Sequence, residues 1–320
     1  MERGPTEPAR PTGPVQRVHW GAIAAACLGA ALPILAILVA VMLQRPARVR
    51  TRPPVSAAVP AAALAPAPAP APAAARAPLV AEARPRIALV IDDAGVDAER
   101  SARAIRLQPG VTLAFLPYAP AVRQQIEAAR RAGHEVLAHV PMQPLDGRHD
   151  PGPNTLLVGQ SREELRRALD ASLSLVPPVV GINNHMGSRF TGDRDGMNLL
   201  FAELAHRGLL FLDSRTVEHT AARASAMRYG VPYAQRDVFL DHVEDAGAVR
   251  RQLELLERQA RQHGVAVGIG HPRDVTLREL EQWLPELEQR GFALVPVSTI
   301  VQRPESVPHG SPSPVGAKVR

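Results

Sequence analysis

Three residue types are scarce in this 320-residue chain, and each scarcity excludes a class of chemistry. The single cysteine, Cys27, lies in an apolar segment, which excludes a disulfide framework and a cysteine-ligated zinc site. The single lysine, Lys318, lies near the C-terminus, which excludes a Schiff-base lysine and the lysine of a phosphate-binding P-loop. Aromatic residues make up only 3% of the chain, so a stacking surface for single-stranded nucleic acid is not expected.

The net charge of +6 comes from the N-terminal part of the chain. Residues 1–85 contain 9 arginines and 3 acidic residues, which leaves 28 basic and 28 acidic residues in 86–320. A nucleic-acid-binding domain is expected to place an excess of arginine and lysine on one face. The balance therefore predicts that nucleic acid is not a partner.

The N-terminal region predicts a membrane anchor. After an N-terminal tail, residues 1–19, an uncharged run of 24 residues extends over 20–43, longer than the ~20 residues that span a bilayer. A cleaved signal peptide is the competing interpretation, but its apolar region is usually only ~7–15 residues long. Arginines flank both ends of the run, so the positive-inside rule does not decide its orientation.

Two further segments lack the composition of a folded core. Residues 44–85 are rich in alanine and proline, a composition that favours an extended spacer. Residues 303–320 are rich in proline, serine and glycine, and we expect a disordered tail there. The catalytic or binding domain is therefore expected within 86–302.

Apolar runs alternate with amphipathic stretches through residues 86–302. The apolar runs predict strands at Arg86–Ile91, Val111–Leu116, Glu135–Val140, Val179–Asn183, Leu209–Asp213, Val265–Gly270 and Ala293–Val297. The amphipathic stretches predict helices at Ala98–Leu107, Ala121–Ala132, Arg162–Leu175, Gly196–His206, Ala246–His263 and Thr276–Arg290. Such alternation is typical of an α/β fold with a mostly parallel sheet, either open or closed into a barrel.

Several of these strands end in side chains that bind metals or move protons. These residues are Asp92-Asp93, His139, Asn183-Asn184-His185, Asp213-Ser214 and His271. Each has a structural alternative: an aspartate after a strand often caps the next helix, a histidine can be a satisfied core residue, and Gly187 can supply a positive φ in a turn. Because the carboxyl ends of parallel strands meet at one edge of the sheet, their recurrence favours a common site.

One carboxylate and two imidazoles can form a three-ligand site with an open position, where a divalent metal activates water. In a pair of adjacent aspartates, one carboxylate can face the metal while its neighbour accepts a proton from the water. A separate histidine across the site would then donate a proton to the departing group. The other histidines lie near helix ends or in loops and are weaker candidates, with Asp241-His242 the strongest of them.

These motifs resemble those of the polysaccharide deacetylase superfamily, in particular its divergent branch of bacterial envelope proteins, over about residues 85–302. Val90-Ile91-Asp92-Asp93-Ala94-Gly95 resembles the family's Asp-Asp-Gly motif with one inserted residue, and Gly133-His134-Glu135 followed by His139 resembles the lead-in and first histidine of its second motif. The family's second histidine position is occupied by Gln143, and Asn183-Asn184-His185-Met186-Gly187-Ser188 stands where the family has an arginine-proline motif. Gly270-His271-Pro272 resembles the last motif.

The resemblance implies a role for each matching residue. It makes Asp92 the catalytic base, Asp93 and His139 metal ligands, and His185 the substitute for the missing second histidine. It places Asp213 in a block that orients the base and makes His271 the general acid. A backbone N–H near Asn184 or Gly187 would stabilise the oxyanion.

The expected fold is a distorted β/α barrel of the polysaccharide deacetylase type, preceded by one transmembrane helix. The expected protein is a single-pass component of the bacterial inner membrane whose domain 86–302 faces the periplasm. There it would remove acetyl groups from an acetylated envelope glycan, with Zn²⁺ as the expected ion. The alternatives are a non-catalytic glycan-binding or scaffold module on the same fold and, ranked last, a metal phosphoesterase, for which only Arg189 and Arg215 lie near the motifs.

Overall fold

The computed structural model describes residues 84–302, which contain a sheet of nine strands. The strands are β1 (Arg86–Ala94), β2 (Thr112–Phe115), β3 (Glu135–Met142), β4 (Gly181–Met186), β5 (Leu210–Asp213), β6 (Tyr233–Gln235), β7 (Val238–Phe239), β8 (Val265–Gly270) and β9 (Ala293–Leu294). The helices are α2 (Ala98–Ile105), α3 (Val122–Arg131), α4 (Arg162–Ser174), α5 (Arg194–Arg207), α6 (Ala222–Tyr229), α7 (Ala246–His263) and α8 (Asp274–Leu287), with a 3₁₀ turn, η2, at Val297–Thr299.

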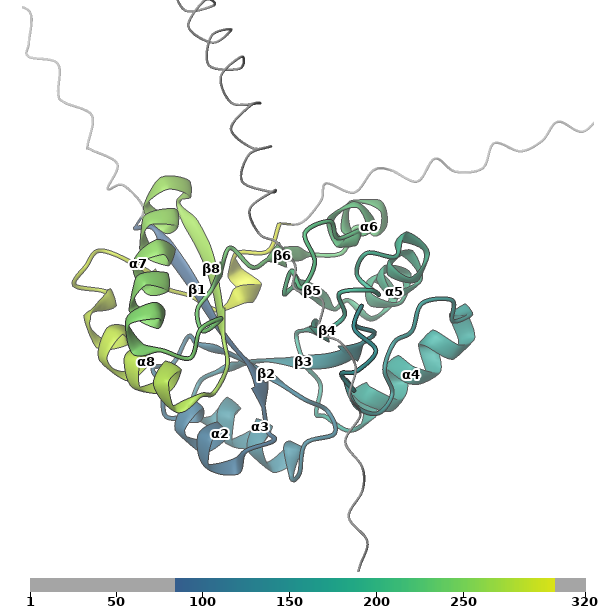
Figure 1. Ribbon diagram of the computed structural model, residues 1–320, viewed down its shortest axis with the longest axis horizontal. Helices are drawn as coiled ribbons and strands as arrows, with labels where there is room; N and C mark the ends of the chain where they lie inside the picture. The colour runs from purple at the N-terminus through teal and green to yellow at the C-terminus, as the bar shows by residue number, and fades with distance from the viewer. Residues whose placement is uncertain (1–83, 303–320) are drawn as a thin grey trace, which may run out of the picture. The chain divides into compact units, whose positions relative to one another are not determined.

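Local signals in the sequence account for where several helices begin. Asp97 caps α2 and Asp193 caps α5 through side-chain oxygens that accept backbone N–H groups of the first turn. Ser161 and Glu164 form a reciprocal capping box at the start of α4. The helices lie around the outside of the curled sheet (Figure 1).

All the named strands pair in parallel, in the order β6-β5-β4-β3-β2-β1-β8-β7, with β9 added beside β1. The two ends of this order, β6 and β7, are consecutive in the chain and are joined only by Arg236 and Asp237. They do not pair with each other, so the sheet is a curled half-barrel and the predicted barrel is open at this point. The short segment between them connects its two edges.

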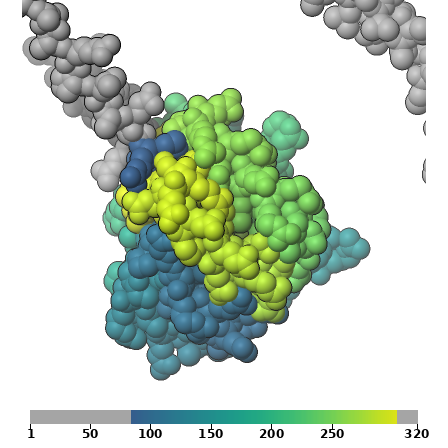
Figure 2. Space-filling view, turned by 90° about the vertical axis from the view of Figure 1, so that its left-hand side faces the viewer, coloured from purple at the N-terminus to yellow at the C-terminus, as the bar shows by residue number. Residues whose placement is uncertain are grey.

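The last part of the described chain returns to the first strand. Beside the first half of β1, β9 pairs with Arg86 and Ile87, and β2 pairs with the second half of β1 from Val90 onward. In the space-filling view, the yellow C-terminal segment lies against the dark-blue start of β1 (Figure 2). The two ends of the domain therefore stabilise each other.

The apolar residues form two layers that follow the alternation of strand side chains. In β1, Ile87, Leu89 and Ile91 pack in a large cluster with helix residues, whereas Ala88 and Val90 belong to a smaller cluster of strand residues on the inner face. The inner cluster also contains Ala114, Leu137, Leu212, Ala234, Val267, Ile269 and Val297. The position of a residue along its strand therefore decides whether it faces the helices or the interior.

The seven predicted strands and six predicted helices are all present, with ends shifted by a few residues. Three elements are not predicted from the sequence, namely α6, β6 and β7, because α6 has only eight residues and the two strands have three and two. The last strand is shorter than predicted, since β9 ends at Leu294 and Val297 begins a 3₁₀ turn.

The predicted tail 1–19, anchor 20–43 and C-terminal tail 303–320 lie outside the described residues, as does the spacer 44–85 except for its last two residues. Within residues 84–302, no helix is both long enough and apolar enough to cross a membrane.

Gly95, directly after β1, tests how tightly the turn that follows this strand is packed. Its φ is 109°, and a Cβ there would lie 2.6 Å from Cβ of Ala119. We expect Gly95→Ala to lower the free energy of unfolding by about 2–4 kcal/mol, because backbone strain and overpacking add. Urea denaturation measures this loss.

Gly208→Ala is the matched control, since Gly208 also has a positive φ, 65°, but a Cβ there meets no atom within 4 Å. Strain alone is expected to cost about 1–2 kcal/mol at that position. Equal losses in the two variants would show that the contact with Ala119 is unimportant.

Candidate metal centre

The strand alternation directs one set of polar side chains into the interior of the half-barrel. In β3, Ala138 and Val140 pack toward the helices, so His139 between them faces inward. In β4, Ile182 packs outward, so Asn183 and His185 face inward. These polar residues lie at the C-terminal ends of strands whose inner faces are otherwise apolar.

Both aspartates at the end of β1 reach this interior because the backbone departs from the strand conformation between them. Asp92 continues the inward series of Ala88 and Val90. Asp93 has a left-handed φ of 55°, which is uncommon for a residue other than glycine. The turn places neighbouring carboxylates beside the same histidine, since His139 Nε2 lies 3.8 Å from Asp92 Oδ2 and 3.2 Å from Asp93 Oδ1.

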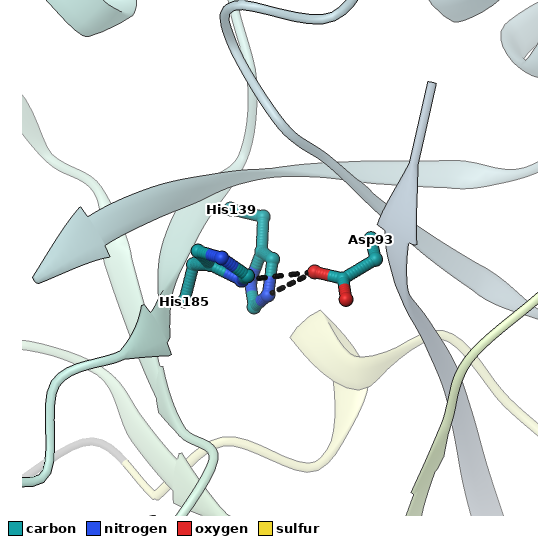
Figure 3. A group of neighbouring side chains, drawn as sticks. All are labelled: Asp93, His139 and His185. Atoms are coloured by element: carbon teal, nitrogen blue, oxygen red, sulfur yellow. Dashed lines mark ion pairs between the residues drawn. The ribbon is translucent and has the colours of Figure 1, made fainter. Parts of the chain in front are cut away.

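Asp93, His139 and His185 form a compact three-residue group (Figure 3). Each offers one ligand atom, and these atoms lie within 4.8 Å of one another. Asp93 Oδ1 is 3.2 Å from His139 Nε2 and 2.9 Å from His185 Nδ1. Tetrahedral ligands at ~2.0–2.1 Å from a zinc ion lie roughly 3.3 Å apart, so these separations fit a shared ion.

The hydrogen bonding of Asp93 supports the same interpretation. Its Oδ1 is buried and has no hydrogen-bond partner among residues 84–302, although two imidazole nitrogens are close to it. Burial raises the pKa of Asp93, but the adjacent His139 and His185 outweigh burial and hold that pKa well below its usual range. An ionised carboxylate oxygen without a hydrogen-bond partner, together with the two imidazole nitrogens beside it, is a suitable set of ligands for a divalent cation.

Asn183 links this ligand set to Asp92. Its Oδ1 lies 2.8 Å from His139 Nδ1, and its Nδ2 donates a 2.7 Å hydrogen bond to Asp92 Oδ1. An amide oxygen accepts only, so in the neutral imidazole of His139 the proton is on Nδ1 and the lone pair of Nε2 is available to a metal. All three side chains are buried, and burial lowers the pKa of His139 less than the carboxylates of Asp92 and Asp93 raise it.

His271, after β8, faces the group from another side. Its Nδ1 lies 3.0 Å from Asp241 Oδ1, and its Nε2 lies 3.8 Å from Asp93 Oδ2. Asp241 is fully buried and also accepts hydrogen bonds from the His271 backbone N–H and the Thr276 hydroxyl. Burial lowers the pKa of His271, but Asp241, Asp93 and Asp92 together raise it above its ordinary value.

Asp92, Asp93, His139, His185 and His271 line one pocket of about 460 Å³. The pocket wall also contains Asn184, Met186, Ser214, Arg215, Thr216, Arg236, Phe239 and Ile269. Its volume falls in the usual range for small-molecule sites, ~300–1,000 Å³. The arrangement can hold a cation beside a carboxylate and an imidazole that are free to accept and donate protons.

A sequence model of the family described as divergent polysaccharide deacetylase matches residues 89–301, which include every site residue named above. The chain belongs to this family. The Escherichia coli (strain K12) protein YibQ, whose function is uncharacterised, is 35% identical over 220 residues, covering 69% of this chain and 68% of YibQ. An uncharacterised protein of Haemophilus influenzae is 34% identical over 209 residues, 65% of this chain and 74% of the relative.

The same fold occurs in a solved structure. The crystal structure of the uncharacterised protein ATU2773 from Agrobacterium tumefaciens C58 superposes with a TM-score of 0.67 at 31% identity, covering 70% of this chain and 92% of that one. The deacetylase-like fold of this family member is thus shared with a protein whose structure was determined by experiment.

The departure of this deacetylase family member at Gln143 has a structural explanation. The Gln143 side chain accepts a hydrogen bond from the Val158 backbone N–H, and its carbonyl accepts from Arg189 and Phe190. Gln143 therefore joins two loops. His185, the predicted substitute, is the residue that the structure brings next to Asp93 and His139.

Asp213 is separated from the base that it was predicted to orient. In β5, Leu212 faces inward and Phe211 faces the helices, so Asp213 also faces outward. It accepts hydrogen bonds from the Arg215 backbone N–H and the Tyr233 hydroxyl. Ser214, one residue later, is the neighbour that contacts Asp92, at 3.4 Å.

Of the two residues predicted to lie near the oxyanion, only one lines the pocket. Asn184 lines the pocket, and its Oδ1 accepts a hydrogen bond from the Ser214 N–H. Gly187 does not line this pocket; its carbonyl accepts two hydrogen bonds from Thr191, and a Cβ on it would lie 2.8 Å from Met142. Asp241, in the pair Asp241-His242 that leads the weaker candidates, is the partner of His271, and its place after the very short β7 brings it there.

Asn183 tests whether the ligand geometry depends on its carboxamide. Asn183→Ala removes the acceptor that fixes His139, so we expect the affinity of the purified protein for Zn²⁺ to fall roughly 10–100-fold. Isothermal titration with Zn²⁺ measures the change.

Asn198→Ala is the control, because Asn198 accepts a hydrogen bond from Ser225 away from the pocket. Its Zn²⁺ affinity should equal that of the unmodified chain. A folded Asn183→Ala protein with unchanged affinity would contradict the role of Asn183.

Proposed function

We propose that this protein is a metal-dependent hydrolase that removes acetyl groups from a glycan. The observation that carries the proposal is the convergence of Asp93, His139 and His185 in a pocket that also presents Asp92 and His271. Membership of a family described as polysaccharide deacetylases supports a glycan as the acetylated substrate. The proposed catalytic region is residues 86–302.

Asp93 Oδ1, His139 Nε2 and His185 Nδ1 would hold the ion, and Zn²⁺ is the ion that we propose for one carboxylate and two imidazoles. When bound, such an ion acidifies a water molecule and polarises a carbonyl group. Asn183 fixes the tautomer of His139 in advance, so the ligand atoms need little rearrangement.

Asp92 is the proposed general base. It is only 3% exposed, and Asn183 and Ser214 contact its two oxygens. These contacts hold the carboxylate beside the ligand group without neutralising it, since neither neighbour carries a charge. Asp92 can therefore accept a proton from the attacking water.

His271 is the proposed general acid. Asp241 holds its Nδ1, which leaves Nε2 directed toward Asp93 Oδ2 at 3.8 Å. The raised pKa of His271 keeps the imidazole protonated to higher pH, ready to donate a proton to the departing amine or alcohol. A backbone N–H near Asn184 is the proposed donor to the oxyanion.

The sequence of the N-terminal region supports a cellular location for this activity. Residues 20–43 would anchor the chain in the bacterial inner membrane, and the spacer 44–85 would hold the domain on the periplasmic side. This part of the proposal rests on the composition of those segments.

The first test measures acetate release and metal content together. Full-length protein should release acetate from acetylated envelope polysaccharides when Zn²⁺ is added. Asp93→Ala, His139→Ala and His185→Ala should lower metal content, whereas Asp92→Ala should keep the metal and lose roughly 10²–10⁴-fold in rate, because only the base is removed.

His206→Ala is the matched control for the histidine variants, since His206 is exposed on α5. It should retain both metal and activity. Metal content unchanged in His185→Ala would remove His185 from the ligand set. Glycan binding without acetate release from any substrate would favour a non-catalytic module.

The second test concerns the pH dependence that Asp241 gives to His271. A general acid must be protonated, so the rate should fall as pH rises through the pKa of His271. Asp241→Asn removes the charge that raises this pKa, so the alkaline limb of the kcat profile should move to lower pH. Asp146→Asn, at an exposed carboxylate paired with Arg148, should leave the limb in place. An unmoved limb in Asp241→Asn would contradict the assignment.

The third test concerns location. A reporter enzyme fused after Pro85 is expected to be active on the periplasmic side of the membrane, because the uncharged run before the spacer would send the chain across. Activity confined to the cytoplasm would overturn this part of the proposal.

A further inference from the structure

Two arginines in the pocket wall are unused by the proposed chemistry. Arg215 follows β5, and Arg236 lies between β6 and β7. Both line the pocket that contains Asp93, His139 and His185. Strand β5 pairs with the imidazole-bearing β4, and Arg236 lies in the segment that connects the two edges of the sheet, β6 and β7.

Arg236 is held in place by groups that do not neutralise its charge. Its Nε donates to the Ser214 carbonyl at 2.7 Å, and its Nη2 donates to the Arg215 carbonyl at 2.8 Å. Its guanidinium also lies over the Phe239 ring, 4.8 Å from the centroid. The group is thus fixed in position before any ligand binds.

Arg215 lies next to this fixed cation. Its backbone has a left-handed φ of 48°, stabilised by a hydrogen bond from its N–H to Asp213 Oδ1. Its side chain makes no hydrogen bond or ion pair with any other part of residues 84–302. The Arg215 guanidinium therefore contributes a second charge at the same wall without a protein partner.

The charges of the two groups are uncompensated at close range. No carboxylate in the described part of the chain lies within 4.0 Å of either guanidinium, although Glu218 and Asp237 line the next hollow. Burial and the neighbouring Arg215 lower the pKa of Arg236 more than the more distant carboxylates of Asp213, Asp92 and Asp237 raise it. An anion bound at this wall would offset both the burial of the Arg236 charge and its repulsion by Arg215.

The two arginines also stand between two hollows. Together with Thr216 they line the main pocket and a neighbouring hollow of about 310 Å³. A ligand with one end at the metal centre can therefore pass over both guanidinium groups. This geometry suits an extended substrate, such as an oligosaccharide, better than an isolated small molecule.

We propose that Arg215 and Arg236 form a subsite for an oxyanion, so that the substrate is an acetylated glycan that carries a carboxylate or a phosphate near the acetylated sugar. A guanidinium binds either group through paired N–H donors. Arg236 retains three of its five N–H groups and Arg215 retains all five, so the wall has donors for such a group. This inference rests on the proposed deacetylase activity for the identity of the substrate. The anion subsite itself does not depend on turnover.

The experiment uses full-length protein with Zn²⁺ and three matched acetylated disaccharides, which carry a hydroxymethyl group, a carboxylate or a phosphate on the sugar next to the acetylated one. Acetate release gives kcat/KM, and isothermal titration of the three deacetylated disaccharides gives binding that is independent of turnover. The unmodified protein should favour an acidic substrate over the neutral one by roughly 10–100-fold, as expected for hydrogen bonds between charged groups. The carboxylate and phosphate arms identify which oxyanion is preferred.

Arg215→Gln should abolish this preference, because a neutral carboxamide carries no charge to pair with the oxyanion. Arg189→Gln is the matched control, because Arg189 is exposed and does not line the pocket. It should keep the full preference. Circular dichroism confirms that each variant is folded.

Turnover without preference for an acidic substrate, or a preference that survives Arg215→Gln, would overturn the subsite and leave the deacetylase proposal standing. Absence of turnover on all three substrates, with acidic disaccharides still binding through Arg215, would overturn the deacetylase proposal and support the subsite. The two failures are therefore distinguishable.

Discussion

The carboxamide of Asn183 contacts both the proposed metal ligand His139 and the proposed base Asp92. Its oxygen faces His139 and its nitrogen faces Asp92, so one buried side chain fixes a metal ligand and the proposed base. The amide cannot be reversed without placing its oxygen against the Asp92 carboxylate and its nitrogen against a ring N–H. Because an unpaired buried polar group costs about 1–3 kcal/mol, this single orientation is strongly favoured.

That arrangement depends on the alternation of side chains along parallel strands. Small and apolar residues fill the interior below the site, and polar residues occupy the next inward positions, at His139 in β3 and Asn183 in β4. These two residues are register partners in neighbouring strands, which is why their side chains meet. At the end of β1 the left-handed Asp93 interrupts the alternation and adds a second carboxylate to the same space. The backbone strain of Asp93 therefore lies at a position where binding of a cation by its carboxylate would offset it.

Much of the site follows from the sequence because strand ends in a parallel sheet share one edge. His139, His185, Asp93 and His271 could be grouped on that basis. The direction of a side chain is harder to predict, since an error in parity moves it to the opposite face. Asp213 shows this, because it ends a strand as predicted but faces the helices with Phe211. Asp241 ranks only among the weaker candidates for a different reason: it follows a strand of two residues, too short for any periodic pattern.

The opening of the half-barrel gives the pocket two electrostatically different sides. Asp92 and Asp93 of β1 and the imidazoles of β3 and β4 form one part of the pocket wall, whereas Arg215 follows β5 and Arg236 lies in the segment between the two edges of the sheet. The carboxylates and imidazoles would attract a cation and the two arginines would repel one, so a metal ion would be confined to the Asp93 side of the pocket. Once two of the acidic charges are matched by a divalent ion, the two guanidinium groups leave the pocket with excess positive charge. A neutral sugar would gain nothing from that excess, whereas an anionic one would be drawn across the wall with its acetyl group toward the metal centre.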